Sequence, residues 1–267
     1  MNTTIVNAGF LQFNPLLGQP NENIKNIALL IDEAMHANLL VIPELANSGY
    51  NFESKEQALQ LAVTDNKSNY LNLLQEKASQ HNMFIVSGFL EREDDKLFNS
   101  SILVGPNGIL GKYRKIHLFW NEFDFFERGN LGLPVFDLGF CKIGMLICFD
   151  WIFPEVWRIL AIKGADIICH PSNLVLPYAQ QAVPVQGMIN RTFNITANRF
   201  GTEREVTFSG KSFISDPFGK TLVSASPDED EIGIAKLDIS KARNKMITPR
   251  NHAFNDRIPE EYTEILN

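Results

Sequence analysis

The sequence predicts an α/β protein built as a four-layer αββα sandwich, with two mixed β-sheets packed face to face between outer layers of helices. Short runs such as 39–42 are apolar at both parities, as in strands buried on both faces. These runs alternate with helical stretches in β-α-β-α-β order, the pattern of an α/β fold. Hairpins also occur, which excludes a purely parallel sheet. Two mixed sheets satisfy all three observations, because every strand then has one face on the other sheet and one on helices.

The first elements follow from hydrophobic periodicity. The run 4–13 is predicted to be the first strand, and an amphipathic helix follows it. The run 39–42 is a buried strand, a second helix covers about 69–80, and 83–90 is a third strand. The apolar side of the first helix is formed by Ile24, Ile27, Ala28, Ile31, Ala34 and Met35.

Two hairpins with the same turn chemistry follow. In the segment 101–113, Pro106 suits position i+1 of a type I turn, and Gly108 supplies a residue of positive φ. The segment 212–223 repeats the Pro-x-Gly device. This weak similarity suggests that the chain has two similar halves.

The rest of the chain alternates in the same way, and no Ser/Gly-rich or low-complexity linker divides it. We therefore expect one domain over residues 1–267. Helices are expected at about 154–163 and 182–192. Strands are expected at 141–148, 166–170, 195–198 and 232–237.

Charge and cysteine content exclude several classes of protein. With 24 basic and 31 acidic residues the net charge is −7, and no basic run marks a nucleic-acid surface. Three cysteines make a disulfide framework unexpected and suit a reducing, cytoplasmic compartment. No charge precedes Glu22, so the basic region of a signal peptide is missing. The charge-free stretches 1–21 and 167–190 contain Pro, Asn and Gln, so neither indicates a membrane span.

Three reactive side chains each follow a strand-like run, where α/β proteins build their sites. Glu44 closes the run 39–42 after Pro43, although a carboxylate there also fits a helix N-cap or a surface salt bridge. Lys115 lies in a basic segment that ends a hairpin, which fits a solvated turn equally well. The third is Cys148, and its alternative is a buried structural cysteine, the better interpretation of the other two cysteines.

The surroundings of Cys148 favour reactivity. It ends a predicted strand just before a helix marked by Asp150 and Pro154. A thiol near a helix N-terminus has its thiolate favoured by the helix dipole and by free backbone N–H groups. The turn also leaves the N–H of Phe149 free to bind a developing oxyanion.

Together these segments resemble the nitrilase superfamily of carbon–nitrogen hydrolases, from the first strand to about Asn244. The motifs are Pro-Glu44, Gly-Lys-Tyr-Arg-Lys115-Ile-His-Leu-Phe and Ile-Cys148-Phe-Asp-Trp-Ile-Phe-Pro-Glu, with a second glutamate of the family matching Glu122. The resemblance implies the αββα sandwich. It also implies a homodimer or higher homo-oligomer, with the tail 243–267 packed on a partner subunit. Prokaryotic enzymes that act on small aliphatic amides and nitriles are the most similar branch.

The residue types suggest a mechanism through a thioester. Cys148 attacks an amide carbon, Glu44 moves the proton, and Lys115 with the N–H of Phe149 stabilises the oxyanion. Glu122 orients Lys115 or the substrate and keeps the amine protonated. No cofactor is required, and no His/Cys cluster has metal-ligand spacing. Substrate-binding candidates, each of which also fits core or wall packing, are Tyr50, Phe119, Trp151 and Asn173.

The reaction itself stays open at this point. Phe149-Asp150 follows the nucleophile, a pattern more similar to amidases than the Trp-Glu of many nitrilases, so amide hydrolysis is favoured. Nitrile and N-carbamoyl amine hydrolysis are the nearest alternatives. A papain-like enzyme would instead pair the thiol with His117 or His170. A binding protein with a vestigial site is the alternative of a different class.

Overall fold

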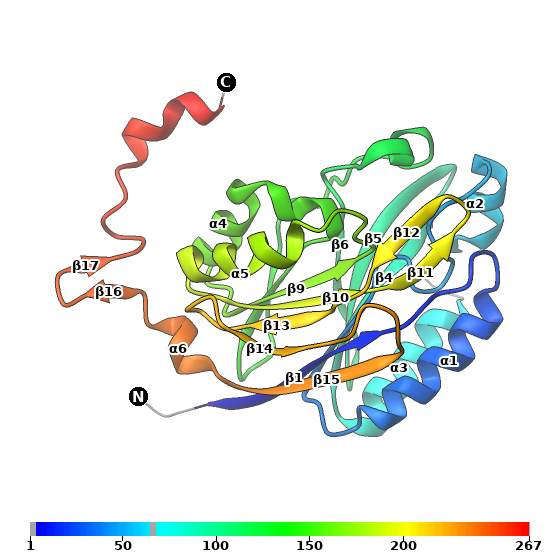
Figure 1. Ribbon diagram of the computed structural model, residues 1–267, viewed down its shortest axis with the longest axis horizontal. Helices are drawn as coiled ribbons and strands as arrows, with labels where there is room; N and C mark the ends of the chain where they lie inside the picture. The colour runs from blue at the N-terminus through cyan, green and yellow to red at the C-terminus, as the bar shows by residue number, and fades with distance from the viewer. Residues whose placement is uncertain (1–3, 65–67, 267) are drawn as a thin grey trace.

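The computed structural model of the protein describes residues 4–64 and 68–266, so residue 267 of the expected tail lies outside the described residues. Figure 1 shows helices above and below two stacked sheets. The helices are α1 Pro20–Glu33, α2 Lys55–Leu61, α3 Asn69–His81, α4 Pro154–Ile162, α5 Ala179–Asn190 and α6 Ile239–Arg243, with 3₁₀ turns η1 Trp120–Asp124, η2 Cys148–Ile152 and η3 Pro259–Leu266. The strands are β1 Ile5–Gln12, β2 Leu39–Ile42, β3 Val63–Thr64, β4 Phe84–Glu93, β5 Lys96–Gly105, β6 Gly108–Arg114, β7 Val135–Asp137, β8 Lys142–Met145, β9 Ile167–Ser172, β10 Phe193–Asn198, β11 Phe200–Glu203, β12 Val206–Ser209, β13 Phe213–Ser215, β14 Thr221–Ser224, β15 Glu231–Asp238, β16 Met246–Thr248 and β17 Asn251–His252.

Both large sheets are mixed, as the sequence predicts. The first has the order β15-β1-β2-β4-β5-β6, with β3 beside β4. The second has the order β14-β13-β10-β9-β8-β7. The pairs β1–β2, β2–β4, β8–β9 and β9–β10 are parallel, and the flanking pairs are antiparallel.

The two sheets share one pattern of strand pairing, which agrees with the suggestion of similar halves except that β15, from the C-terminal part of the chain, belongs to the first sheet. In each sheet one antiparallel pair is followed by two parallel and then two antiparallel pairs. The hairpins β5–β6 and β13–β14 occupy the same place in this pattern. Gly108 and Gly219 in these hairpins have positive φ, at 122° and 83°, as the turn chemistry predicts.

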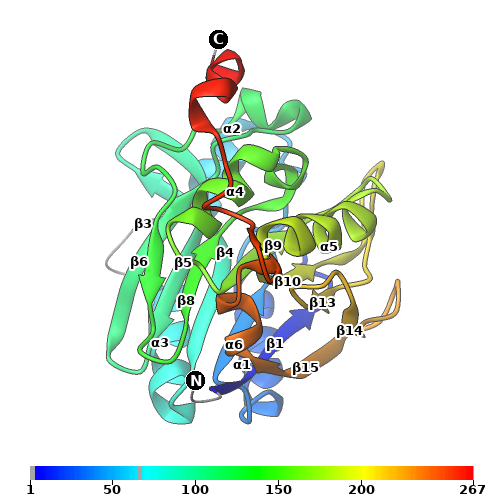
Figure 2. The same cartoon turned by 90° about the vertical axis from the view of Figure 1, so that its left-hand side faces the viewer.

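Side-chain parity in β2 shows how four layers arise. Leu39 and Val41 join a buried cluster that reaches the second sheet, whereas Leu40 and Ile42 join a cluster with α1 and α3. The second sheet is covered by α4 and α5, whose Trp157 belongs to the first of these clusters. The order in space is therefore α4/α5, second sheet, first sheet, α1/α3, as Figures 1 and 2 show.

Three sequence-based expectations need correction. The edge strands β6 and β14 expose much of their length, so not every strand has both faces covered. Met35 was expected on the apolar side of α1 but is 51% exposed. The helix ends at Glu33, so Met35 no longer follows the helical spacing that would direct it to the core. The strand expected at 141–148 ends at Met145, because the chain turns into η2 at Cys148. The sequence also gave no prediction for α2 or for the β11–β12 hairpin.

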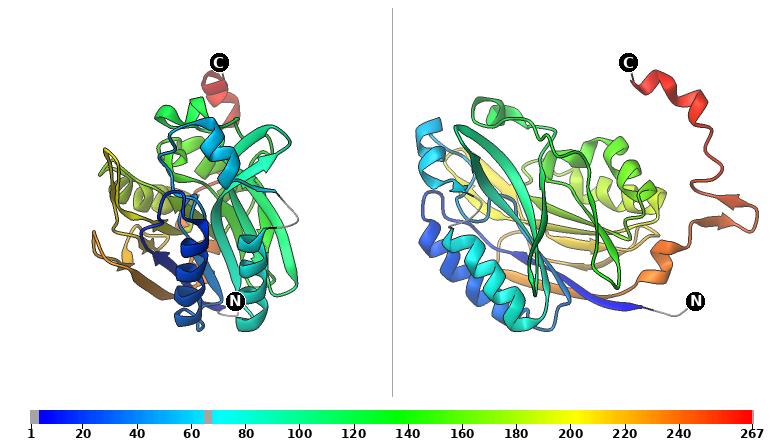
Figure 3. Two further views of the ribbon diagram at one scale, coloured as in Figure 1. Left: turned by 90° about the vertical axis from the view of Figure 1, so that its right-hand side faces the viewer. Right: turned by 180° about the vertical axis from the view of Figure 1, so that it is seen from behind.

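The C-terminal segment leaves the sandwich after α6. Figure 1 and the right-hand view of Figure 3 show residues 244–266 standing off the body beside α4 and α5. Its exposed apolar side chains are Met246, Ile247, Ile258, Tyr262 and Ile265. This segment has no apolar core of its own among the described residues.

Candidate active site

Glu44 lies two residues beyond β2, and its buried carboxylate accepts from side chains, which excludes both a surface salt bridge and a helix N-cap. Its Oε1 accepts hydrogen bonds from the Lys115 amine at 2.9 Å and from Asn99 Nδ2 at 2.7 Å. Its Oε2 is buried and has no partner among the described residues. Hydrogen bonds therefore hold one oxygen of this carboxylate in place, and the other oxygen is available to accept a proton.

The backbone of Glu44 passes directly over Gly88 of β4. A Cβ atom added at Gly88 would lie 2.4 Å from the Cα of Glu44. Hydrogen bonds at 3.2 Å and 3.3 Å also join Gly88 to Pro43 and Ala46. Because glycine alone permits this approach, the neighbouring strand sets the position of the carboxylate.

Lys115 follows β6, and its side chain is buried, so the expected alternative of a solvated basic turn is wrong. Its Nζ lies 2.9 Å from Glu44 and 2.7 Å from Glu122 Oε1. Burial opposes its charge, but the carboxylates of Glu122 and Glu44 outweigh burial and raise the pKa of the amine. The side chain is thus held as a permanent cation.

Glu122 lies in η1 and completes this charged group. Its Oε1 also accepts from the Tyr50 hydroxyl at 2.9 Å, and its Oε2 accepts from the backbone N–H of Phe119 at 3.1 Å. Burial raises the pKa of Glu122 to about 7, against the opposing effect of Lys115. Two carboxylates therefore share one ammonium.

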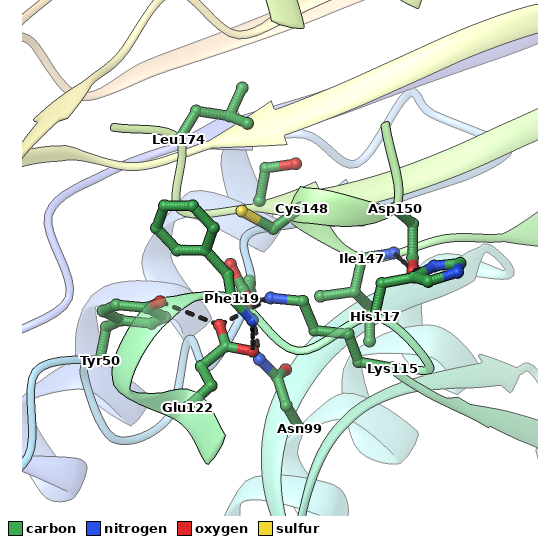
Figure 4. A network of polar contacts seen from close by, with 12 residues as sticks. Tyr50, Asn99, Lys115, His117, Phe119, Glu122, Ile147, Cys148, Asp150 and Leu174 are labelled. Atoms are coloured by element: carbon green, nitrogen blue, oxygen red, sulfur yellow. Dashed lines mark hydrogen bonds and ion pairs between the residues drawn. The ribbon is translucent and has the colours of Figure 1, made fainter. Parts of the chain in front are cut away.

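Cys148 is the first residue of η2 and has φ of +42°, a left-handed conformation that costs a residue with a side chain roughly 1–2 kcal/mol. Figure 4 shows its sulfur beside the Lys115 amine and the Phe119 ring. Burial, and then the charge of Glu44, raise the pKa of the thiol well above its usual range. Lys115 and the backbone N–H of Asn173 oppose that rise.

The expectation of a thiolate favoured by a helix N-terminus is therefore wrong. The helix α4 begins at Pro154, and only the short turn η2 intervenes after Cys148. Because the thiol is buried, desolvation raises its pKa despite the opposing charge of Lys115. The proton must instead be removed by a neighbouring base when the sulfur reacts.

Neither His117 nor His170 is hydrogen-bonded to the Cys148 sulfur. His170 Nε2 lies 2.9 Å from the backbone carbonyl of Cys148, and His117 Nδ1 lies 2.7 Å from Asp150 Oδ1. Asp150 also accepts from the Tyr113 hydroxyl at 2.7 Å and from the N–H of Ile147 at 2.9 Å. A papain-like Cys–His pair is thus absent from the described residues around the thiol.

A small cavity of about 10 Å³ lies against Cys148. A larger chamber of about 610 Å³ adjoins it and includes His117, Trp120 and Arg128. Phe119 and Phe149 line both spaces, with ring centroids 5.0 Å apart. The remaining residues that line the small cavity are Trp151, Asn173, Leu174, Val175 and Leu176.

Of the candidate substrate-binding residues, Phe119, Trp151 and Asn173 line the small cavity and Tyr50 does not. Both amide atoms of the Asn173 side chain are buried without a partner among the described residues, which leaves one donor and one acceptor for a ligand. Tyr50 instead donates to Glu122 and packs edge-on against Phe208, and it does not line the cavity. A substrate-binding role for Tyr50, Phe119, Trp151 and Asn173 stays a prediction.

The sequence did not single out Asn99, and it noted Asp150 only as a helix signal. Asn99 faces the site from β5, where three polar residues in a row, 99–101, are buried. That run of polar residues inside a strand was the available signal. Among residues 4–64 and 68–266, no three His, Cys, Asp or Glu side chains group closely enough to hold a metal ion. In the same residues no helix is long and apolar enough to cross a membrane.

Comparison with known proteins gives one consistent result. The sequence model of the family described as "Carbon-nitrogen hydrolase" matches residues 7–245. The chain is 45% identical to a nitrilase of Pyrococcus abyssi over 97% of this chain and 99% of the relative. It is 30% identical to a 2-oxoglutaramate amidase of Bacillus subtilis over 92% and 95%. Its fold matches a carbon–nitrogen hydrolase of Helicobacter pylori G27 with a TM-score of 0.88 at 24% identity, over 98% and 99% of the two chains.

Proposed function

The chain belongs to the carbon–nitrogen hydrolase family of the nitrilase superfamily, and we propose that it is an amidase that converts a small aliphatic amide to a carboxylic acid and ammonia. One observation carries the proposal. A buried thiol lies beside an ammonium that is held between two buried carboxylates, and one oxygen of Glu44 has no partner within residues 4–64 and 68–266. This set supplies a nucleophile, a base and a fixed positive charge.

In the first step, Cys148 attacks the amide carbon and forms a carbon–sulfur bond. Glu44 Oε2 takes the thiol proton as the bond forms, since the buried thiol does not ionise by itself. The carbonyl oxygen gains negative charge, which the Lys115 ammonium and the Phe149 N–H stabilise. Glu44 then gives the proton to the leaving nitrogen, the carbon–nitrogen bond breaks, and ammonia departs from a thioester.

In the second step, water cleaves the thioester. Glu44 takes a proton from water while the oxygen attacks the carbonyl carbon, and the same cation and N–H stabilise the second oxyanion. The sulfur leaves and regains its proton, which releases the acid. Glu122 keeps Lys115 charged through both steps.

The cavity supports small substrates. A space of about 10 Å³ beside Cys148 is just large enough for about one water, so the walls must move to admit the scissile amide and only a small group would fit against the sulfur. The rest of the substrate would lie beyond the Phe119 and Phe149 rings, toward the larger chamber. The unpartnered amide of Asn173 would bind the polar atoms of the substrate.

Nitrile hydrolysis is the second candidate, because the Pyrococcus abyssi relative is named a nitrilase. Hydrolysis of N-carbamoyl amines uses the same attack on a carbon–nitrogen bond. A panel of small amides, nitriles and N-carbamoyl amines separates these reactions. Amides and nitriles both yield an acid and ammonia, so they are distinguished by which substrate is turned over, whereas carbamoyl substrates alone also yield carbon dioxide. We expect ammonia release to be fastest from small amides.

Two variants test the chemistry. Cys148→Ala should abolish turnover and keep the fold, and activity retained in that variant would refute the assignment. Glu44→Gln should also be inactive, whereas a papain-like enzyme would tolerate it. For a vestigial binding site, iodoacetamide would label Cys148 no faster than it labels Cys141 and Cys169, both of which are buried.

We also propose that the chain works as a homodimer or larger homo-oligomer through its C-terminal segment. Residues 244–266 project with exposed apolar side chains, beside a groove of about 650 Å³ between this segment and the helices α4 and α5. Such a segment needs a partner surface, and a second copy offers the matching helices. The apolar side chains lining the groove include Ile159, Ile162, Ile189, Tyr262 and Ile265.

A further inference from the structure

We propose that His170 is a positioning residue, which aims the oxyanion-binding N–H of Phe149 by holding the carbonyl of Cys148. His170 lies in β9, on a different element from every group assigned a chemical role above. The inference rests on the proposed function, because it concerns the oxyanion that the thiol creates.

His170 contacts the Cys148 carbonyl directly, and the donor and the acceptor of this hydrogen bond can be assigned. His170 is fully buried, and its Nε2 lies 2.9 Å from the Cys148 carbonyl oxygen. A carbonyl only accepts, so the imidazole proton must be on Nε2. Burial lowers the pKa of His170 to about 4, so near neutral pH the ring carries one N–H only. Its Nδ1 is then an acceptor, with the Thr196 hydroxyl 3.1 Å away.

The planarity of the peptide bond turns this contact into an orienting device. The carbonyl of Cys148 and the N–H of Phe149 belong to one planar trans peptide unit and point in opposite directions. A carbonyl held toward His170 therefore directs the N–H to the other side of the unit, and both residues of this unit, Cys148 and Phe149, line the small cavity. As the second residue of η2, Phe149 has an N–H without an intrahelical acceptor.

The conformation of Cys148 needs such support. A residue with φ of +42° persists only where its surroundings hold it. The Asn173 N–H acts on the sulfur, and Asp150 accepts from the Ile147 N–H before the turn. Of these contacts only the one from His170 acts on the peptide unit that carries the Phe149 N–H. Loss of the imidazole should leave the sulfur in place and let this peptide unit rotate.

The test separates oxyanion stabilisation from thiol placement. In His170→Leu we expect kcat/KM for the best amide to fall roughly 10–100-fold, mainly through kcat, because the Phe149 N–H is misaligned but still present, whereas complete loss of an oxyanion donor costs about 10²–10³. Alkylation of Cys148 by iodoacetamide forms no oxyanion, so its rate should stay within about threefold of wild type. His170→Gln should recover part of kcat, because its amide can donate to the same carbonyl.

Thr196→Val is the matched control. It removes the hydroxyl behind the ring and keeps the Nε2 donor, so its loss of kcat should be clearly smaller than that of His170→Leu. Normal kcat in a folded His170→Leu variant would overturn the inference, as would equal losses of alkylation and hydrolysis. If Cys148→Ala also hydrolysed amides, both the proposed function and this inference would fail. An inactive Cys148→Ala beside a fully active His170→Leu would refute the inference alone.

Discussion

Gly88→Ala should damage catalysis more than stability, although Gly88 carries no chemical group. The added Cβ would lie 2.4 Å from Glu44 Cα and 2.6 Å from the Pro43 carbonyl oxygen. Heavy atoms prefer separations of about 3.5–4.0 Å, so the end of β2 must retreat by roughly 1 Å. Both contacts are backbone atoms, so no side-chain rotation relieves the overlap. A displacement of about 1 Å at a reacting group lowers turnover by roughly 10²-fold.

The assay compares kcat with the melting temperature. Overpacking costs about 1–3 kcal/mol, or roughly 2–12 °C in Tm for a chain of this size, so the variant should still fold. Gly105→Ala is the matched control in the same sheet. Its Cβ would meet side-chain atoms of Phe84 and Leu110 far from Glu44, at 2.9–3.2 Å. We expect Gly105→Ala to lose stability alone and Gly88→Ala to lose about 10²-fold in kcat. A folded Gly88→Ala variant with more than a third of wild-type kcat would refute the role given to the position of Glu44.

Three further predictions follow from the charges and the tail. Lys115→Met leaves Glu44 and Glu122 buried without their cation, so unfolding by urea should show a loss of about 3–5 kcal/mol together with the loss of activity. Because burial raises the pKa of Glu122 from 4.5 to about 7, the folded chain binds this proton more tightly than the unfolded chain. The stability of wild type relative to Glu122→Gln should therefore fall by about 3 kcal/mol as pH rises from 4.5 to 7, and equal slopes in pH-dependent melts would contradict this. Removal of residues 246–267 should lower the oligomeric state measured by light scattering, and an unchanged mass would count against a tail-mediated assembly.

Most of the layer architecture could be read from local pattern, because a strand buried on both faces must be apolar at both parities. Leu39 to Ile42 show this, since alternate residues enter different clusters. The pattern failed where an element ends. Met35 continues the helical period of α1, but the chain leaves the helix before that side chain reaches the core. The prediction that both faces are buried was wrong for the edge strands β6 and β14 for a related reason. The sequence of a strand does not show whether a neighbouring element covers it.

The sequence by itself determined which chemical groups the chain can bring to a site, through Glu44, Lys115, Glu122 and Cys148 and the short motifs around them. Only the tertiary structure decided the protonation states of these groups. Lys115 is a stable cation because two carboxylates lie around it, Glu122 from the turn seven residues on and Glu44 from a segment 71 residues away in sequence, and the thiol keeps its proton because the same packing excludes water. The contact of His170 with the Cys148 carbonyl joins β9 to η2, which no local pattern encodes. Proton affinity and peptide orientation depend on distances between elements, and only the folded chain sets those distances.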